Sequence, residues 1–374
     1  MDFTLTEEQA VLIDSARRYL RDNYGFEVQR RRAQMSDGLG VWGDFAEMGW
    51  LGADPCEAGV GFGGGAVEAA LLAQEFGGAL VVEPYIPMAI QAPRMLYALG
   101  AGAERIDAIV AGKARICVAV TEDGGRGDPR HVEACAIALP DGGYRLSGCK
   151  RLVLGGPSAE RVLVSLRIEG YEGVSLIELA VDHPGLQRKD YRLVDRRAVS
   201  DFVLDGLCID PHAVIGAPGE ALPAIALGLD HAIIALCAET LGTMEAALWS
   251  TRDYLRTRQQ FGQPIASFQV LQHRMADMLV EFELARSMLY QGLFALTLEG
   301  EGRTRGVAAT KAVVSRAGLF VGRQAIQLHG GIGMAEESTV GHYYKRIMAN
   351  ASLFGDADMH LERYSESMNV DLID

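Results

Sequence analysis

The last third of the chain gathers residue types that could bind an anionic ligand or move a proton. Residues 327–334 read Gln-Leu-His-Gly-Gly-Ile-Gly-Met, and glycines allow backbone N–H groups to approach a phosphate closely. Residues 353–358 read Leu-Phe-Gly-Asp-Ala-Asp, and the carboxylates of Asp356 and Asp358 could accept a proton. The chemistry available to these groups depends on the elements that hold them.

Long helices are expected to position both segments. Apolar residues recur at helical spacing over residues 222–259, 267–298 and 304–328, and the third repeat leads into the glycine-rich stretch. The second repeat has the narrow apolar seam of a helix in a bundle, with steps of four and three residues between Leu271, Met275, Met278, Phe282, Ala285 and Leu289. Residues 218–374 are therefore predicted to form a long-helix bundle.

Two further segments precede the predicted bundle. Two capping boxes, Thr4 with Glu7 or Thr6 with Gln9, predict a helix from about residue 5, and residues 1–115 as a whole are predicted to be a helical domain. Residues 116–217 alternate turn clusters with short apolar runs, at 116–120, 134–139, 161–166 and 174–181, which predicts a mainly antiparallel sheet or barrel. The fold class is thus α+β.

Composition narrows the functional classes. A net charge of -14 argues against nucleic acid as a partner. The start of the chain lacks the features of a signal peptide and no apolar stretch suggests a membrane span, so we expect a cytoplasmic protein. The six cysteines and eight histidines show no metal-ligand spacing, so no metal site is predicted. No strand is expected before Gly59–Gly65, which argues against a dinucleotide fingerprint there.

Several motifs together resemble the acyl-CoA dehydrogenase family. They are Arg-Gln-Gln-Phe-Gly-Gln-Pro-Ile at 258–265, Phe-Gln-Val-Leu-Gln-His-Arg-Met-Ala-Asp at 268–277, the segment 327–333, and Val-Thr-Glu-Asp-Gly-Gly at 120–125. The resemblance implies an FAD-dependent enzyme that oxidises the Cα–Cβ bond of an acyl-CoA thioester. It also implies an electron-transferring flavoprotein as the acceptor of the electrons.

The resemblance also implies which residues bind FAD. Arg258 and Phe261 would reach the flavin nucleotide of a neighbouring subunit, and Gln269 would lie near its adenine end. A turn on the FAD diphosphate would be formed by Gln327, Leu328, Gly330 and Gly331. Thr121, in the loop of the sheet domain, would also contact FAD. An alternative stays open, in which Arg258 forms a surface ion pair and the glycines only end a helix.

Other family positions have lost their function. The family's catalytic carboxylate position is occupied by Phe354, and its alternative position on an earlier helix by Ala232. The strand that normally stacks on the flavin ring as Trp-x-Thr aligns with Leu152-Val153-Leu154. Nearby acids that could serve as a displaced base are Asp230, Glu239, Asp356 and Asp358, each of which is otherwise expected to be a cap or an exposed acid.

This pattern predicts a partner chain. The segments 61–68, 79–85 and 353–358 resemble the small subunit of pimeloyl-CoA dehydrogenase and similar bacterial chains, which implies a related second subunit. Steroid-degrading mycobacterial dehydrogenases have a similar two-chain arrangement. The alternatives are a self-sufficient homo-oligomeric dehydrogenase or oxidase that uses Asp356 or Asp230, and a scaffolding paralogue that binds neither flavin nor CoA. Candidate cations for the CoA phosphates are Arg126, Arg130, Lys150 and Arg151.

Overall fold

The computed structural model describes residues 4–34, 39–54, 64–140 and 142–370. Residue contacts divide the chain into two compact units, which are described separately. The helical unit comprises Met1–Arg30, Ala70–Val81 and Ile233–Asp374, and the sheet unit comprises Arg31–Ala69 and Val82–Ala232. Residues 59–63 of the glycine-rich stretch lie outside the described residues. The domain boundaries at residues 115 and 217 stay a prediction.

The first helix of the helical unit begins where a capping box predicts it. Helix α1 (Glu7–Asn23) starts after Thr6, whose hydroxyl accepts the Gln9 N–H at 3.2 Å while the Gln9 side-chain oxygen accepts the Thr6 N–H at 3.0 Å. These reciprocal bonds satisfy two donors that the helix itself leaves free. The Thr6–Gln9 box is therefore the one used, and the helix begins two residues later than expected. Helix α2 (Phe26–Arg32) follows it.

Two glycines let helix α4 (Ala66–Ala79) pack against helix α7 (Leu222–Thr257) within the helical unit. A Cβ atom added at Gly77 would lie 1.9 Å from the Glu239 carbonyl oxygen, and one added at Gly242 would lie 1.8 Å from that of Gln74. Any larger side chain at either position would force the two backbones apart.

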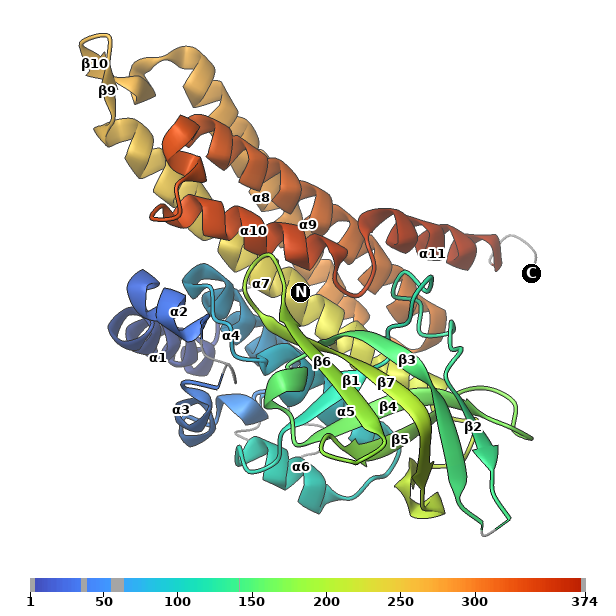
Figure 1. Cartoon of the computed structure of the whole chain (residues 1–374). Coiled ribbons are helices and arrows are strands. Elements are labelled where there is room, and N and C mark those ends of the chain that lie inside the picture. The colour runs from blue at the N-terminus through green and yellow to red at the C-terminus, as the bar shows by residue number, and fades with distance from the viewer. Residues whose placement is uncertain (1–3, 35–38, 55–63, 141, 371–374) are drawn as a thin grey trace. The chain divides into compact units, whose positions relative to one another are not determined.

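The predicted long helices are present. Helix α7 is followed by α8 (Gln269–Ala295) and α9 (Gly300–His329), which lie side by side in Figure 1. Two shorter helices, α10 (Thr339–Ser352) and α11 (Ala357–Val370), also pack against α9. Four members of the predicted α8 seam are buried, namely Met278, Phe282, Ala285 and Leu289, whereas Leu271 and Met275 are half-buried.

The sheet unit contains a single eight-stranded sheet among the described residues. Its strands are β1 (Ile116–Ala119), β2 (Cys135–Ala138), β3 (Tyr144–Leu154), β4 (Arg161–Ile168), β5 (Ser175–Ala180), β6 (Leu186–Arg192), β7 (Ala198–Ile209) and β8 (Val214–Ile215). The strand order is β6-β7-β3-β2-β4-β5-β8, and β1 pairs with β4. Only the β1–β4 and β2–β4 pairs are parallel, so the prediction of a mainly antiparallel sheet is confirmed.

Short helices complete the sheet unit. They are α3 (Trp42–Glu47), α5 (Ala92–Ala98), α6 (Ala103–Val110) and the single 3-10 turns η1 (Trp50–Gly52), η3 (Gly156–Ser158) and η4 (Pro211–Ala213). Residues Ile86–Gln91, predicted to continue as ordinary helix, instead form a fully buried π-helical segment, η2. Helix α5, helix α6 and strands β1, β4 and β5 share one apolar core, which includes Leu96, Ile109, Val118, Leu163 and Leu176.

Helices before and after a strand-rich segment confirm the α+β fold class predicted from the sequence. We expected no apolar stretch long enough to cross a membrane. That expectation was wrong, because α7 has the length and the apolar composition of a membrane-spanning helix. Of its most apolar window, 89% is buried within the protein, as in the core helix of a folded domain.

Candidate functional site

A tight hairpin carries the first predicted nucleotide-binding residues. Between α7 and α8, β9 (Gln259–Gln260) pairs with β10 (Gln263–Pro264) through a two-residue turn in which Phe261 and Gly262 both have positive φ. Such a turn matches the twist of the paired strands, and Figure 1 shows β9 and β10 as a hairpin at the end of α7 and α8. Phe261 is 90% exposed and meets Phe268 edge-on, with ring centres 5.9 Å apart.

The neighbouring candidates of the hairpin are also accessible. Arg258 is exposed directly after α7, and Gln269 is exposed as the first residue of α8, which the single turn η5 (Ile265–Ser267) precedes. A guanidinium, an aromatic ring and an amide are thus presented to solvent within a short stretch. These groups suit a nucleotide, through charge, stacking and hydrogen bonding respectively.

The glycine-rich segment forms a turn at the end of α9. Gly330 ends the helix with φ 62, and the single turn η6 (Gly330–Met334) follows. A Cβ atom added at Gly330 or Gly331 would have no other atom within 4 Å, so this backbone faces open space. Gln327 is exposed, whereas Leu328 is buried, so Leu328 does not present its side chain to a ligand.

A contact that the sequence did not reveal joins these two segments. Tyr254, one turn before Arg258 on α7, stacks on His329 with ring centres 4.4 Å apart, and its hydroxyl donates to the His329 carbonyl at 3.3 Å. The His329 Nδ1 atom lies 2.8 Å from the Ala325 carbonyl oxygen, and burial lowers the pKa of the imidazole. A neutral, packed His329 therefore fixes the end of α9 against α7 near both motifs.

The position of the family's ring-binding strand offers no aromatic group. The register of β3 with β7 shifts between Lys150 and Val153, and Leu152 adopts φ 54 with its side chain 41% exposed. Val153 and Leu154 are buried. Thr121, in the loop after β1, is half-buried, and its carbonyl accepts the Arg151 N–H at 2.9 Å. Leu152, Val153 and Leu154 therefore offer neither an aromatic ring to stack on a flavin nor a hydroxyl group to bond it.

The two positions at which the family places its catalytic base are occupied by Phe354 and Ala232, neither of which can accept a proton. Phe354 is half-buried with φ 57, and its carbonyl accepts a hydrogen bond from His360 Nε2 at 3.0 Å. Burial lowers the pKa of His360 to about 4, so the imidazole is neutral near pH 7. Ala232 is completely buried.

The nearby acids differ in what holds them. Asp356 caps α11, because its Oδ1 accepts the Met359 N–H at 2.8 Å, and Asp358 pairs with Arg316 at 3.0 Å on the surface. Glu239 accepts from Arg346 at 3.0 Å and from Asn350 at 3.1 Å inside the helical unit. Asp230 is completely buried in the sheet unit.

His231, between Asp230 and Ala232, is held by a distant residue. Its Nδ1 lies 2.9 Å from a carboxylate oxygen of Asp54, which Arg94 also binds with two hydrogen bonds. Burial would raise the pKa of Asp54, but the bonds from His231 and Arg94 lower it overall. This buried charge network fixes the first turns of α7 within the sheet unit, and no sequence spacing indicated it.

One candidate for the CoA phosphates was wrong. Lys150 is completely buried, and its Nζ donates to Glu122 at 2.6 Å and to Ser165 at 2.8 Å. Burial lowers the pKa of its ammonium group, and the Glu122 carboxylate opposes that shift. Arg130 pairs with Asp128, and Arg151 pairs with Asp123 and Asp201. Arg126 is exposed.

Comparison with known proteins gives a consistent match. The acyl-CoA dehydrogenase N-terminal domain matches residues 6–103 and the acyl-CoA dehydrogenase C-terminal domain matches residues 222–369. The short-chain specific acyl-CoA dehydrogenase of Megasphaera elsdenii is 27% identical over 232 residues, which are 60% of this chain and 60% of that enzyme.

Two solved structures extend the likeness over the whole chain. A variant of the Tcur3481-Tcur3483 steroid ACAD superposes with a TM-score of 0.87 at 28% identity, covering 99% of this chain and 100% of that one. The ChsE4-ChsE5 complex from Mycobacterium tuberculosis has a chain with a TM-score of 0.88 at 24% identity, covering 99% of both chains.

The residues present fit one half of FAD, the cofactor of this family. Exposed Arg258, Phe261 and Gln327 and the open backbone at Gly330 and Gly331 suit its nucleotide and diphosphate. The Leu152–Leu154 strand does not suit its ring. When bound, FAD supplies the acceptor for the hydride removed from a substrate carbon. With both domain models matched, in order and over roughly two thirds of its length, the chain belongs to the acyl-CoA dehydrogenase family of FAD-dependent oxidoreductases.

Proposed function

We propose that this chain is the base-lacking subunit of a heteromeric acyl-CoA dehydrogenase. A related second chain supplies the catalytic carboxylate and the aromatic wall beside the flavin ring. The observation that carries this proposal is the contrast between two sets of positions. Arg258 and Phe261 are exposed and suited to a nucleotide, whereas Phe354, Ala232 and Leu152 offer neither a base nor a ring contact.

The chemistry explains why that loss matters. An α-proton of a thioester is weakly acidic, so a positioned carboxylate must accept it while the β-hydride leaves. Asp356 is exposed and already serves as a helix cap, and Glu239 is committed to Arg346 and Asn350. Both carboxylates therefore have structural roles that a proton-accepting role would disrupt.

Partner dependence is also supported by exposed apolar side chains on one face of α8. Residues on that face follow one another at steps of three and four, and four of them are exposed apolar side chains: Val270, Val280, Leu284 and Phe294. These four side chains are ten, four and ten residues apart, and polar residues separate Val280 and Leu284 from the other two on the same face. Exposed apolar side chains on one face of a helix are typical of a surface that another chain covers. Solved relatives include a ChsE4-ChsE5 complex, and we assign the α8 face to the related chain.

The proposed substrate is an acyl-CoA thioester, and electrons leave the complex to an electron-transferring flavoprotein. The resemblance of this sequence to the small subunit of pimeloyl-CoA dehydrogenase also implies two related chains. The chain contributes its hairpin and its glycine turn to the nucleotide of an FAD whose ring lies against the partner.

Substitution of the hairpin tests this role. In the complex with the chain encoded beside it, Arg258→Ala or Phe261→Ala should weaken FAD binding by about 10- to 100-fold, since each removes a contact worth roughly 1.5–3 kcal/mol. Arg256→Ala, which removes another exposed arginine at the end of α7, is the matched control. FAD titration of the deflavinated complex measures the effect, and unchanged affinity in both hairpin variants would exclude this contribution.

A further inference from the structure

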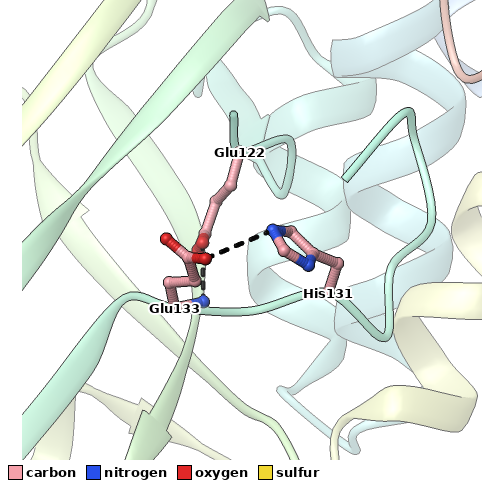
Figure 2. A group of neighbouring side chains, drawn as sticks. All are labelled: Glu122, His131 and Glu133. Carbon is pink, nitrogen blue, oxygen red and sulfur yellow. Dashed lines mark hydrogen bonds and ion pairs between the residues drawn. The ribbon is translucent and has the colours of Figure 1, made fainter. Parts of the chain in front are cut away.

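Three potential metal ligands meet on the sheet unit, and one of them, Glu122, belongs to the segment 120–125 that carries Thr121. Glu122 follows β1, and His131 and Glu133 lie just before β2 (Figure 2). One ligand atom from each lies within 4.8 Å of the other two. His131 Nε2 is 3.7 Å from a carboxylate oxygen of Glu133. The chain brings these residues together by folding the loop back on itself, which residue spacing did not reveal.

Glu122 is rigidly held at the base of this group. Its Oε1 accepts from Lys150 Nζ at 2.6 Å and from the Ala134 N–H at 3.2 Å, and its Oε2 accepts from the Glu133 N–H at 2.6 Å. Each carboxylate oxygen has a second lone pair, so Oε2 can still bind a cation. A carboxylate fixed by several donors loses little freedom when it becomes a ligand.

The donor set suits zinc better than magnesium or calcium. An imidazole nitrogen and two carboxylates are common Zn²⁺ ligands, whereas Mg²⁺ and Ca²⁺ prefer oxygen alone. His131 Nε2 lies 3.1 Å from the Asp123 carbonyl oxygen, which can only accept a hydrogen bond. Without metal, the ring proton is therefore on Nε2, and metal binding requires the Nδ1–H tautomer. The Asp123 carbonyl oxygen is then available as a fourth ligand, the third that is an oxygen.

The surroundings leave room for water to complete the coordination. A pocket of about 330 Å³ adjoins the group and is lined by Glu122, Asp123, Glu133, Cys135, Ser147 and Cys149, among others. The side chain of Glu122 is only 4% exposed, that of His131 is 35% exposed and that of Glu133 is 77% exposed. An ion could thus enter from solvent and meet a buried anchor.

We propose that Glu122, His131 and Glu133 form a Zn²⁺ site that closes the loop between β1 and β2. The ion ties the start of this loop to its end, and Thr121 stands at the start. Zinc occupancy therefore holds in place a residue that the family resemblance assigns to the cofactor. This site is separate from the heteromer proposal, because all three ligands belong to one unit of this chain.

Zinc titration of the purified full chain tests the site. After treatment with a chelator, ZnCl₂ should bind with one ion per chain, and His131→Gln or Glu133→Gln should each weaken binding by about 10- to 100-fold. His212→Gln and Glu169→Gln remove exposed groups elsewhere in the sheet unit and serve as controls. Glu122 is left unchanged, because its loss would strand the buried charge of Lys150.

A second readout identifies the ligands. Cobalt bound in place of zinc should give visible absorption bands of a low-coordinate nitrogen and oxygen site, and these bands should disappear in His131→Gln. The neighbouring thiols provide the critical comparison. If Cys135→Ser or Cys149→Ser abolishes binding while the His131 and Glu133 variants bind normally, the ion sits on the thiols and the proposal fails. Absence of stoichiometric zinc binding by the wild-type chain also overturns it.

Discussion

At the residue scale, two departures from the family pattern, Leu152 and Phe354, have an unusual backbone conformation, whereas a third, Ala232, lies within helix α7. Among the described residues, Leu152, Phe261 and Phe354 are non-glycine residues with positive φ, at 54°, 54° and 57°. This region costs a residue with a side chain roughly 1–2 kcal/mol. The three positions mark the ring strand, the nucleotide hairpin and the base position. Leu80, Arg126 and Arg196 also have positive φ, so this conformation by itself does not mark a functional position.

Asp356 provides a direct test at this scale. Asp356→Ala should lower the free energy of unfolding by about 1 kcal/mol, because the cap of α11 is lost, and should leave turnover of the complex unchanged. Asp356→Asn should be nearly neutral for stability, since asparagine caps helices as well as aspartate. Denaturant unfolding and steady-state rates measure both effects. A fall in turnover by orders of magnitude with FAD still bound would identify Asp356 as the base.

At the element scale, regular helices and strands were largely predictable, and irregular segments were not. The capping box at Thr6 is a local sequence motif. Helices α7, α8 and α9 are indicated by apolar residues that recur at helical spacing in the sequence. The π-helical segment Ile86–Gln91 is buried all round, so no periodicity distinguishes it from ordinary helix.

The local geometry of the candidate site was predictable only where a short motif determines it, and the binding roles of these residues stay a prediction. The hairpin Phe261 and the turn at Gly330 follow from short motifs. The burial of Lys150 depends on Glu122 and Ser165, and the His231–Asp54 pair joins residues far apart in the chain. Contacts across such separations are set by the folded core and leave no mark in nearby sequence. The positive φ at Leu152 likewise depends on a register shift between β3 and β7.

The exposed apolar side chains of α8 are predicted to contact the partner chain. Val280→Glu combined with Leu284→Glu should weaken assembly with the partner at least tenfold, because each buried apolar side chain contributes about 1.5–3 kcal/mol and each glutamate must be desolvated. Val11→Glu on α1, at a side chain that is 69% exposed, is the matched control. Analytical ultracentrifugation measures assembly. Equal association of wild type and both variants would place the interface elsewhere.

At the scale of the whole molecule, the chain has the fold of its family with an incomplete set of chemical groups. The matched domain models at residues 6–103 and 222–369 establish the fold, and the exposed groups that we propose bind the nucleotide lie in the helical unit. The positions for ring contact and proton removal offer apolar side chains. A second chain with the complementary groups would make one working site from two incomplete ones.

The most direct measurement is the flavin content and activity of the chain purified alone and together with the chain encoded beside it. We expect no stoichiometric FAD and no acyl-CoA oxidation from the chain alone, and both from the co-purified complex. The flavin absorption spectrum and electron transfer to an artificial acceptor report the two quantities. A homo-oligomer of this chain alone that binds FAD and dehydrogenates an acyl-CoA would contradict the proposed role.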